Sequence, residues 1–214
     1  MDCTKFITYI NHISEELKPF HRLRNKKDDG SYVTKSDIQM ESYIITYLQN
    51  VFNSIYFITE EETEQSEESN LYNSQYVAVI DPIDGTENYT SGLKEWGVSI
   101  SIYQNIKSET LEHYASFIIL PDLNEYLYSC GNNTNLNDIQ QYDSRIIGLS
   151  SSLDKDDILK LENNDDFEYR IIGCSVYNLY NVIRGSYYKY INIKHVHNWD
   201  LLAGINLAIR NGLN

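Results

Sequence analysis

The feature that most constrains the fold is an apolar run that stops at a carboxylate-bearing turn. Residues 77–80 read Val-Ala-Val-Ile, and residues 81–86 read Asp-Pro-Ile-Asp-Gly-Thr. A short apolar run with an abrupt polar end is typical of a buried strand that carries a site at its edge. The proline fixes its own φ and favours an extended Asp81, so the turn can aim Asp81 and Asp84 at one point. The glycine lets the backbone approach closely, and the Gly-Thr pair can open a helix whose free amides face an anion.

Two interpretations of this turn are open from its residues. A DxxDG pattern can simply be a polar turn that closes a strand. It can also supply oxygen ligands to Mg²⁺, which usually retains waters that a substrate phosphate can replace. Two such ions about 3.5–4 Å apart clamp the attacking and leaving oxygens of a displacement. That arrangement requires a bridging carboxylate such as Asp81, together with flanking carboxylates.

The hydrophobic pattern predicts a single α+β domain. Apolar residues recur at helical spacing over residues 4–17 and 36–52, and the polar stretch 22–34 between them predicts a turn or short hairpin. Strands are expected at residues 54–58, 77–80, 96–103, 115–120, 125–129, 145–149 and 170–172, helices at 175–183 and 200–209, and an acidic loop at 59–70. Helices, then an antiparallel run, then mixed elements predict a layered sandwich. We expect one domain over residues 1–214, with an N-terminal lobe of about 1–130 and a C-terminal lobe of about 131–214.

Composition excludes several classes of protein. The 214 residues are 42% hydrophobic, enough for one core, and the formal net charge is −14. A surface with this much negative charge repels phosphate backbones and anionic lipid. We therefore expect neither nucleic acid nor a membrane as a partner. A small anionic substrate needs bound cations to reverse the local field. The N-terminus lacks the apolar core of a signal peptide, and no apolar stretch is long enough to span a bilayer. The three cysteines are far apart in the sequence and are expected to be free thiols. We therefore expect a cytoplasmic protein.

The turn and four other segments resemble the inositol monophosphatase superfamily. DPIDGT followed by Asn88 and Tyr89 resembles the first signature of that superfamily, DP(I/L)DGTxN(F/Y). The similar segments elsewhere are residues 26–37 (KKDDGSYVTKSD), 58–61 (ITEE), 173–175 (GCS, before a helix) and 199–204 (WDLLAG, the second signature WDxxAG). They follow the family's order over about residues 26–204.

The resemblance implies a fold and a metal set. The fold would be the αβαβα sandwich of the sugar-phosphatase type. Two or three Mg²⁺ ions would be bound, with Li⁺ sensitivity. The implied metal ligands are Glu60, Asp81, the Ile83 carbonyl, Asp84 and Asp200, with Asp37 near a weaker third site. Because Glu60, Glu61 and Glu62 are consecutive, Glu61 is the second choice for the Glu60 position.

The resemblance also implies an activity, the hydrolysis of a small phosphate monoester by metal-activated water. Thr86, hydrogen-bonded to Asp37, would help to activate the attacking water together with Glu60. The implied substrate-binding residues are Asp84, Gly85, Thr86, Lys27, Gly173, Cys174 and Ser175. A small phosphorylated metabolite is the expected partner.

Two departures from the family pattern leave alternatives open. Inositol-phosphate phosphatases usually carry an acidic residue about six positions before the WD tryptophan, where this chain has Ile193. The Tyr-x-x-apolar pattern there is similar to the branch that acts on adenosine 3′,5′-bisphosphate, so 3′(2′),5′-bisphosphate nucleotidase activity is an alternative. Family chains continue well beyond WDxxAG, and we interpret the C-terminal part as shortened or missing. Apolar surface left uncovered there predicts a homodimer. A catalytically silent metal-binding regulatory protein is the alternative of another class.

Overall fold

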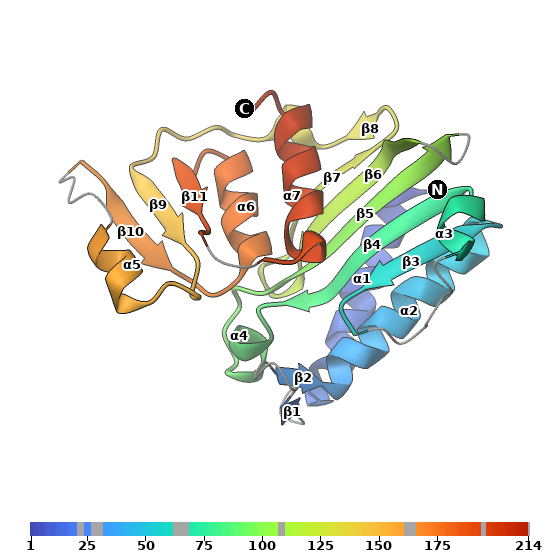
Figure 1. The fold of residues 1–214 in the computed structure, drawn as a ribbon, viewed down its shortest axis with the longest axis horizontal. Helices are drawn as coiled ribbons and strands as arrows, with labels where there is room; N and C mark the ends of the chain where they lie inside the picture. The colour runs from blue at the N-terminus through green and yellow to red at the C-terminus, as the bar shows by residue number, and fades with distance from the viewer. Residues whose placement is uncertain are drawn as a thin grey trace.

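Helices and sheets alternate in layers across the molecule (Figure 1). The computed structural model describes residues 1–20, 24–26, 32–61, 69–106, 110–160, 166–193 and 196–213. Helices α1 (Cys3–Leu17) and α2 (Lys35–Val51) cover one face of a six-stranded sheet, and α7 (Asn198–Arg210) packs on its other face beside α6 (Ser175–Ile183). A three-stranded sheet lies beyond α6 (Figure 1). The predicted α+β layered sandwich is therefore confirmed.

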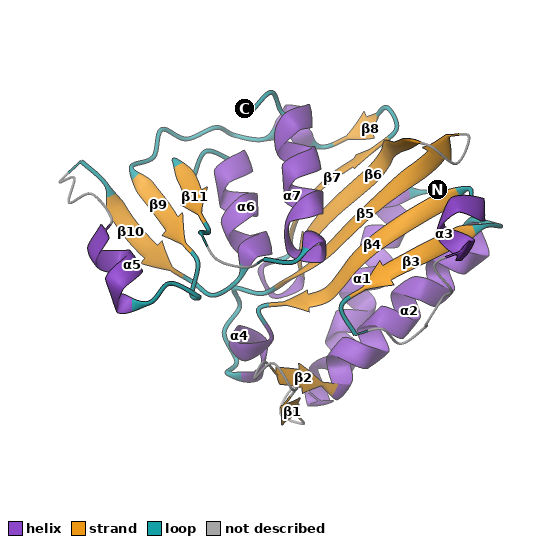
Figure 2. Ribbon diagram, viewed as in Figure 1, coloured by secondary structure: helices purple, strands orange, loops and turns teal. Residues whose placement is uncertain are grey.

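The larger sheet has the strand order β3-β4-β5-β6-β7-β8 (Figure 2). Its strands are β3 (Ile55–Thr59), β4 (Tyr76–Asp84), β5 (Gly97–Ile106), β6 (Thr110–Leu120), β7 (Glu125–Cys130) and β8 (Asn133–Thr134). Strands β3 and β4 are parallel, and all other neighbours are antiparallel. The central strands are buried on both faces because helices cover both sides, which explains their nearly continuous apolar runs.

Strand β4 runs further than the sequence predicts. The expected end at Asp81 is wrong, because pairing with β5 continues to Asp84 opposite Gly97. The register shifts between Asp81 and Asp84, as it does at a β-bulge. A bulge bends a strand and re-aims its side chains. The proline-containing turn is thus part of the strand, and it redirects the two aspartates while the ladder continues.

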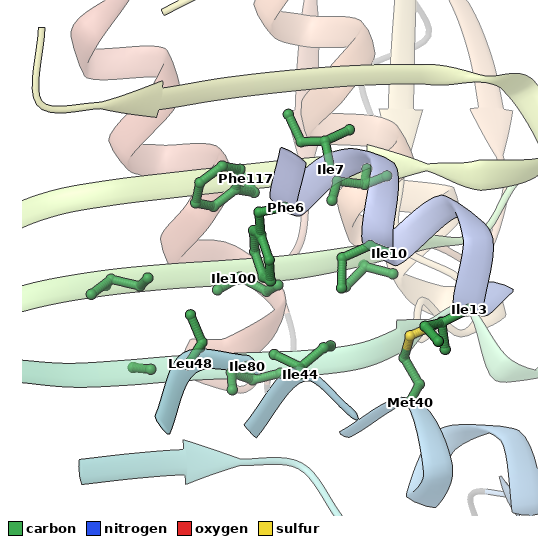
Figure 3. Close-up of a cluster of buried hydrophobic side chains, with 14 of the residues drawn as sticks. Phe6, Ile7, Ile10, Ile13, Met40, Ile44, Leu48, Ile80, Ile100 and Phe117 are labelled. Carbon is green, nitrogen blue, oxygen red and sulfur yellow. The ribbon is translucent and has the colours of Figure 1, made fainter. Parts of the chain in front are cut away.

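The main hydrophobic core lies between the first two helices and the sheet (Figure 3). Phe6 and Ile10 of α1 and Met40 of α2 are fully buried. The Phe6 ring packs edge-on against Phe117 of β6, with ring centroids 5.2 Å apart. The helical spacing of apolar residues over 4–17 therefore identifies the buried face of α1 correctly. Over 36–52 the same spacing includes Ile38 and Val51, which are 44% and 39% exposed, so the prediction of the buried face of α2 is wrong at these two positions. Within the described ranges, no helix has both the length and the apolar character needed to cross a membrane.

The smaller sheet is parallel, with the order β10-β9-β11. Its strands are β9 (Ile146–Leu149), β10 (Glu168–Ile171) and β11 (Lys189–Ile191). The sequence predicts the first two, and it misses β11 and the helix α5 (Lys155–Lys160) because both are too short to show a hydrophobic period. The shorter elements of the chain are β1 (Arg24–Lys26), β2 (Tyr32–Thr34), α3 (Ser69–Asn73), α4 (Thr86–Thr90), and the 3₁₀ turns η1 (Lys18–Phe20), η2 (Pro121–Leu123) and η3 (Leu136–Asp138). Strands β1 and β2 are antiparallel, as predicted for a short hairpin, whereas most of the predicted acidic loop lies outside the described residues.

The expectation of three free thiols is wrong for two of them. Cys3 at the start of α1 and Cys130 at the end of β7 form a disulfide, with their Cα atoms 6.8 Å apart, whereas Cys174 is free and buried. The two paired residues are 127 positions apart in sequence, and only the packing of α1 across the sheet brings them together. The pairing removes the argument for a reducing compartment, which depended on unpaired cysteines.

Candidate active site

Asp81 lies at the centre of a group of acidic side chains. It is 1% exposed, and its Oδ1 accepts a hydrogen bond from the Ile83 N–H at 3.0 Å. Burial raises the pKa of Asp81 well above its usual range, and the charges of Glu60, Asp84 and Asp200 raise it further. These groups therefore lie close enough to oppose one another's ionisation.

Glu60 reaches Asp81 from the neighbouring strand. It follows β3 directly, and its N–H donates to the Ile80 carbonyl at 3.2 Å, which continues the contact between β3 and β4. Its side chain hydrogen-bonds with that of Asp81. Of the two glutamates considered for this position, Glu60 is thus the one whose side chain the structure brings to Asp81. The backbone N–H of Glu61 donates to Glu41 Oε2 on α2.

Asp84 is held by the N-terminus of α6. Its Oδ2 accepts hydrogen bonds from the Val176 N–H and from the Cys174 thiol, the latter at 3.1 Å. Burial and the charge of Asp200 raise the pKa of Asp84 to about 7. Cys174 is 2% exposed, and burial, with Asp84 beside it, raises the pKa of its thiol. The Gly173-Cys174-Ser175 turn therefore orients an acidic side chain through a helix N-terminus.

Gly85 explains why β4 and the turn before α6 can meet here. Its φ is +84°, and a Cβ at this position would lie 3.0 Å from the Cβ of Cys174. Only glycine adopts this backbone conformation without strain and leaves room for the turn before α6. The close approach of the DPIDGT segment to the Gly173-Cys174-Ser175 turn thus depends on the glycine of DPIDGT.

Thr86 and Asp37 are paired, as the resemblance implies. The Thr86 hydroxyl lies 3.1 Å from both Asp37 Oδ1 and the Ile83 carbonyl. Asp37 is fully buried, and its Oδ2 accepts hydrogen bonds from the Thr34 N–H and hydroxyl in a capping box that starts α2. Burial raises the pKa of Asp37 to about 6, although these hydrogen bonds favour its charged form. The capping box fixes the carboxylate that Thr86 contacts.

Asp200 enters the group from the first turn of α7. Its Oδ2 accepts the His197 N–H at 3.3 Å, and burial followed by the charge of Glu60 raises its pKa to about 6. The Ser99 hydroxyl of β5 donates to the carbonyl of Trp199 at 2.7 Å. This hydrogen bond ties the start of α7 to the sheet one residue before Asp200.

The donor set suits a hard divalent cation. Glu60, Asp81, Asp84 and Asp200 offer carboxylate oxygens, and the Ile83 carbonyl belongs to the same turn. In the part of the chain that the structure describes, no three His, Cys, Asp or Glu side chains are gathered into a ready coordination cage. Several of their oxygens instead accept backbone N–H groups. Burial and acidic neighbours raise the pKa of Asp81 and Asp84 most, and a bound cation would relieve that repulsion.

Two further residues lie at the site that the sequence analysis quoted within motifs but did not name as site residues. Tyr190 of β11 lies 3.1 Å from Ser175 through their hydroxyl oxygens, so it borders the turn before α6. Asn88 is part of the first signature, and its side-chain amide donates to the carbonyls of Glu95 and Ile172, each at 2.7 Å. Asn88 thereby joins α4 to the segment that leads into α6. Lys27, the remaining predicted substrate-binding residue, lies outside the described residues.

Asn88→Asp should weaken the connection between α4 and the segment that leads into α6. Asn88 is 8% exposed and uses its amide as a double donor, whereas a carboxylate would face two carbonyl oxygens. We expect the free energy of unfolding, measured with urea, to fall by about 2–3 kcal/mol. The same change at Asn50, whose amide contacts Thr46 on an exposed face of α2, should alter it by less than about 0.5 kcal/mol. Equal effects at the two positions would contradict the role given to Asn88.

The fold and the acidic site define a class of layered α+β proteins with a carboxylate centre at the end of the larger sheet, between β4 and the N-termini of α6 and α7. The model of the inositol monophosphatase family matches residues 4–209. The chain belongs to the inositol monophosphatase family.

Individual relatives are more distant. The chain is 34% identical over 97 residues to inositol monophosphatase 1 of Bos taurus and 32% identical over 120 residues to the protein qutG of Emericella nidulans. These matches cover 45% and 54% of this chain and 35% and 34% of the two relatives. The matched segments thus span about a third of the curated relatives.

Solved structures share the fold over nearly the whole chain. A staphylococcal inositol monophosphatase complexed with products superposes with a TM-score of 0.77 at 17% identity, covering 98% of this chain and 79% of that chain. An inositol monophosphatase/NADP phosphatase complexed with NADP and Ca²⁺ gives 0.78 at 18% identity, with 96% and 78% covered. At these identities the likeness shows the fold alone.

Proposed function

We propose that the protein is a Mg²⁺-dependent phosphomonoesterase that hydrolyses a small phosphate monoester of the inositol monophosphate type with metal-activated water. The proposal rests above all on the meeting of Glu60 after β3, Asp81 and Asp84 of β4, and Asp200 of α7 around one point. Family membership supports it, because the family comprises Mg²⁺-dependent phosphomonoester hydrolases.

These four carboxylates and the Ile83 carbonyl would hold two or three Mg²⁺ ions, and Asp37 lies nearest the weakest site. When bound, the ions would polarise the phosphate oxygens and lower the pKa of a bound water. The Ca²⁺, Mg²⁺ and Li⁺ complexes of structural relatives make divalent-metal dependence and Li⁺ inhibition reasonable expectations for this chain. Such ions would also reverse the field of a chain with net charge −14.

The Thr86–Asp37 pair would orient the attacking water. Because the Thr86 hydroxyl can donate its proton to Asp37 Oδ1, the lone pairs of its oxygen are free to accept a hydrogen bond from water. Glu60 would accept a second hydrogen bond from that water, so the nucleophile is aimed before it attacks. Catalysis would then consist mainly of positioning and charge neutralisation, as is usual for phosphoryl transfer.

The substrate phosphate would lie against the backbone amides of Gly85 and Thr86, with Lys27 near it. The turn Gly173-Cys174-Ser175 would border the organic part of the substrate, beside Tyr190. Asp84, held by α6, would orient the leaving-group side. Each of these assignments follows the family pattern at positions that this chain retains.

Substrate choice is the finer part of the proposal. Ile193 stands where inositol phosphatases usually have an acidic residue, and it is 59% exposed, so no carboxylate from this position would contact sugar hydroxyls. A relative is described as a dual-specific inositol monophosphatase/NADP phosphatase bound with D-inositol-1-phosphate. A second candidate is therefore the hydrolysis of a nucleotide phosphate such as adenosine 3′,5′-bisphosphate, which the Tyr190 pattern favours.

A phosphate-release panel tests the function and ranks the substrates. It uses inositol 1-phosphate, adenosine 3′,5′-bisphosphate, NADP, fructose 1,6-bisphosphate and histidinol phosphate, each with Mg²⁺ and with EDTA. We expect release that requires Mg²⁺ from at least one of the first three. Equal release in EDTA would contradict the metal mechanism. No release from any substrate, despite Mg²⁺ binding, would favour a catalytically silent regulatory protein.

We also propose a homodimer. Ile205 and Ile209 are 41% and 64% exposed on the same side of α7, and such a stripe is a candidate subunit contact. Light scattering at micromolar concentration should give twice the chain mass, and a monomer would exclude this assembly.

A further inference from the structure

Glu41 is a carboxylate that the proposed mechanism does not use, yet it is completely buried. It lies on α2 with an exposure of 0%, one helical turn after Asp37. Burying a charged group is unfavourable unless hydrogen bonds compensate for the lost water. The position of Glu41 beside the acidic site therefore calls for a specific partner.

That partner is the backbone of the glutamate run. Glu41 Oε2 accepts the N–H of Glu61 at 2.9 Å. The preceding N–H, that of Glu60, donates to the Ile80 carbonyl at 3.2 Å. The peptide units on both sides of the Glu60 side chain are thus held, one by β4 and the other by α2.

We propose that Glu41 is a positioning residue, which sets the register of the glutamate run so that Glu60 and not Glu61 faces Asp81. The inference rests on the proposed function, because it concerns which glutamate serves as ligand. In extended chain, neighbouring side chains point to opposite sides, so a slip of one residue would replace Glu60 by Glu61. The ladder between β3 and β4 ends at Thr59 opposite Ile80, so the hydrogen bond from the Glu61 N–H to Glu41 holds the chain just beyond it and opposes this slip.

Two substitutions distinguish the contribution of the acceptor oxygen from that of the size of the side chain. Glu41→Gln keeps an oxygen that can accept the Glu61 N–H, whereas Glu41→Leu has similar size and no acceptor. Isothermal titration calorimetry with Mg²⁺ should give a Kd within about twofold of wild type for Gln and about 10–100-fold weaker for Leu, the range typical of outer-shell partners. In metal-free protein, the Glu61 amide should exchange with D₂O faster in the Leu variant than in the Gln variant.

The register itself can be tested with neighbouring substitutions. In the wild-type background, Glu60→Gln should abolish most Mg²⁺ affinity and Glu61→Gln should change it by less than about threefold. In the Leu variant, Glu61→Gln should cause a further loss, because the run can then slip. Should Glu41→Leu fail to fold, Glu41→Asp withdraws the acceptor by one methylene and should weaken Mg²⁺ binding by an intermediate factor.

A folded Leu or Asp variant with wild-type Mg²⁺ affinity and an equally protected Glu61 amide would overturn the inference. These two measurements do not depend on turnover. If wild-type protein releases no phosphate, the proposed function fails, while calorimetry and exchange still decide the role of Glu41.

Discussion

Replacing Asp81 by asparagine should abolish Mg²⁺-dependent phosphate release while leaving the fold intact. The two side chains have the same shape, but the amide carries no charge at the point where Glu60, Asp84 and Asp200 converge. Loss of several kcal/mol of metal-mediated stabilisation corresponds to a fall in kcat/KM of about three orders of magnitude or more. Steady-state phosphate release at saturating Mg²⁺ measures this effect.

The loss of activity in Asp81→Asn should not be accompanied by a loss of stability in the metal-free protein. Because the pKa of Asp81 is raised in the folded protein, its charged form opposes folding, and this penalty grows as pH rises toward and through the folded pKa. In EDTA at about pH 8, Asp81→Asn should therefore unfold at the same temperature as wild type or higher. Added Mg²⁺ should raise the unfolding temperature of wild type much more than that of the variant.

The matched control is Asp156→Asn on α5, where the residue is exposed and lies outside the site. Its activity and its response to Mg²⁺ should equal those of wild type. A wild-type rate in Asp81→Asn, or an equal loss in Asp156→Asn, would contradict the central place of Asp81.

Gly204→Val should produce a large loss of stability. A Cβ at Gly204 would lie 2.5 Å from Leu179 Cδ1 and 2.8 Å from Leu179 Cβ, so α6 and α7 are in closest contact there. Because the Leu179 Cβ cannot turn away as a side-chain tip can, the helices must separate. We expect the free energy of unfolding to fall by about 2–3 kcal/mol, as overpacking usually causes. Urea denaturation measures this value.

The displaced helix also carries Asp200, so Mg²⁺ affinity should fall in the folded fraction of the variant. A double-mutant cycle tests the cause. Leu179→Ala should be destabilising alone, but combined with Gly204→Ala it should cost less than the sum of the two single changes, because it removes the Leu179 Cγ and Cδ1 atoms that a Cβ at position 204 would meet. Strict additivity would show that the contact between α6 and α7 is not what requires glycine.

Local pattern predicted much of the fold because the forces involved act over a few residues. Helical spacing identified the buried face of α1 and most of that of α2, with Ile38 and Val51 as the exceptions, and the segment 175–183 coincides with α6. The same reasoning missed β11 and α5, which are too short to show a period. It also ended β4 at Asp81, because a bulge depends on the partner strand β5 and leaves no local signal.

Some residues of the site were predicted from the sequence, and others were recognised only in the structure. The signatures named Asp81, Asp84 and Asp200 because a metal centre needs oxygen donors of particular types, and the structure brings their side chains together. Sequence reasoning passed over Asn88 and Glu41, because an amide that joins two carbonyls and a buried acceptor look like ordinary polar residues until their partners are known.

By itself, the sequence determined the layered α+β class, because hydrophobic periodicity and turn chemistry are encoded by near neighbours. Its motifs carried the resemblance to the family and with it the chemical type of each acidic group. Only the tertiary structure decided that Glu60 rather than Glu61 meets Asp81, and that Cys3 pairs with Cys130. Only the tertiary structure placed Asp84 at the N-terminus of α6. Each of these contacts joins segments that are far apart in the chain, and their geometry exists only after the helices have packed on the two sheets.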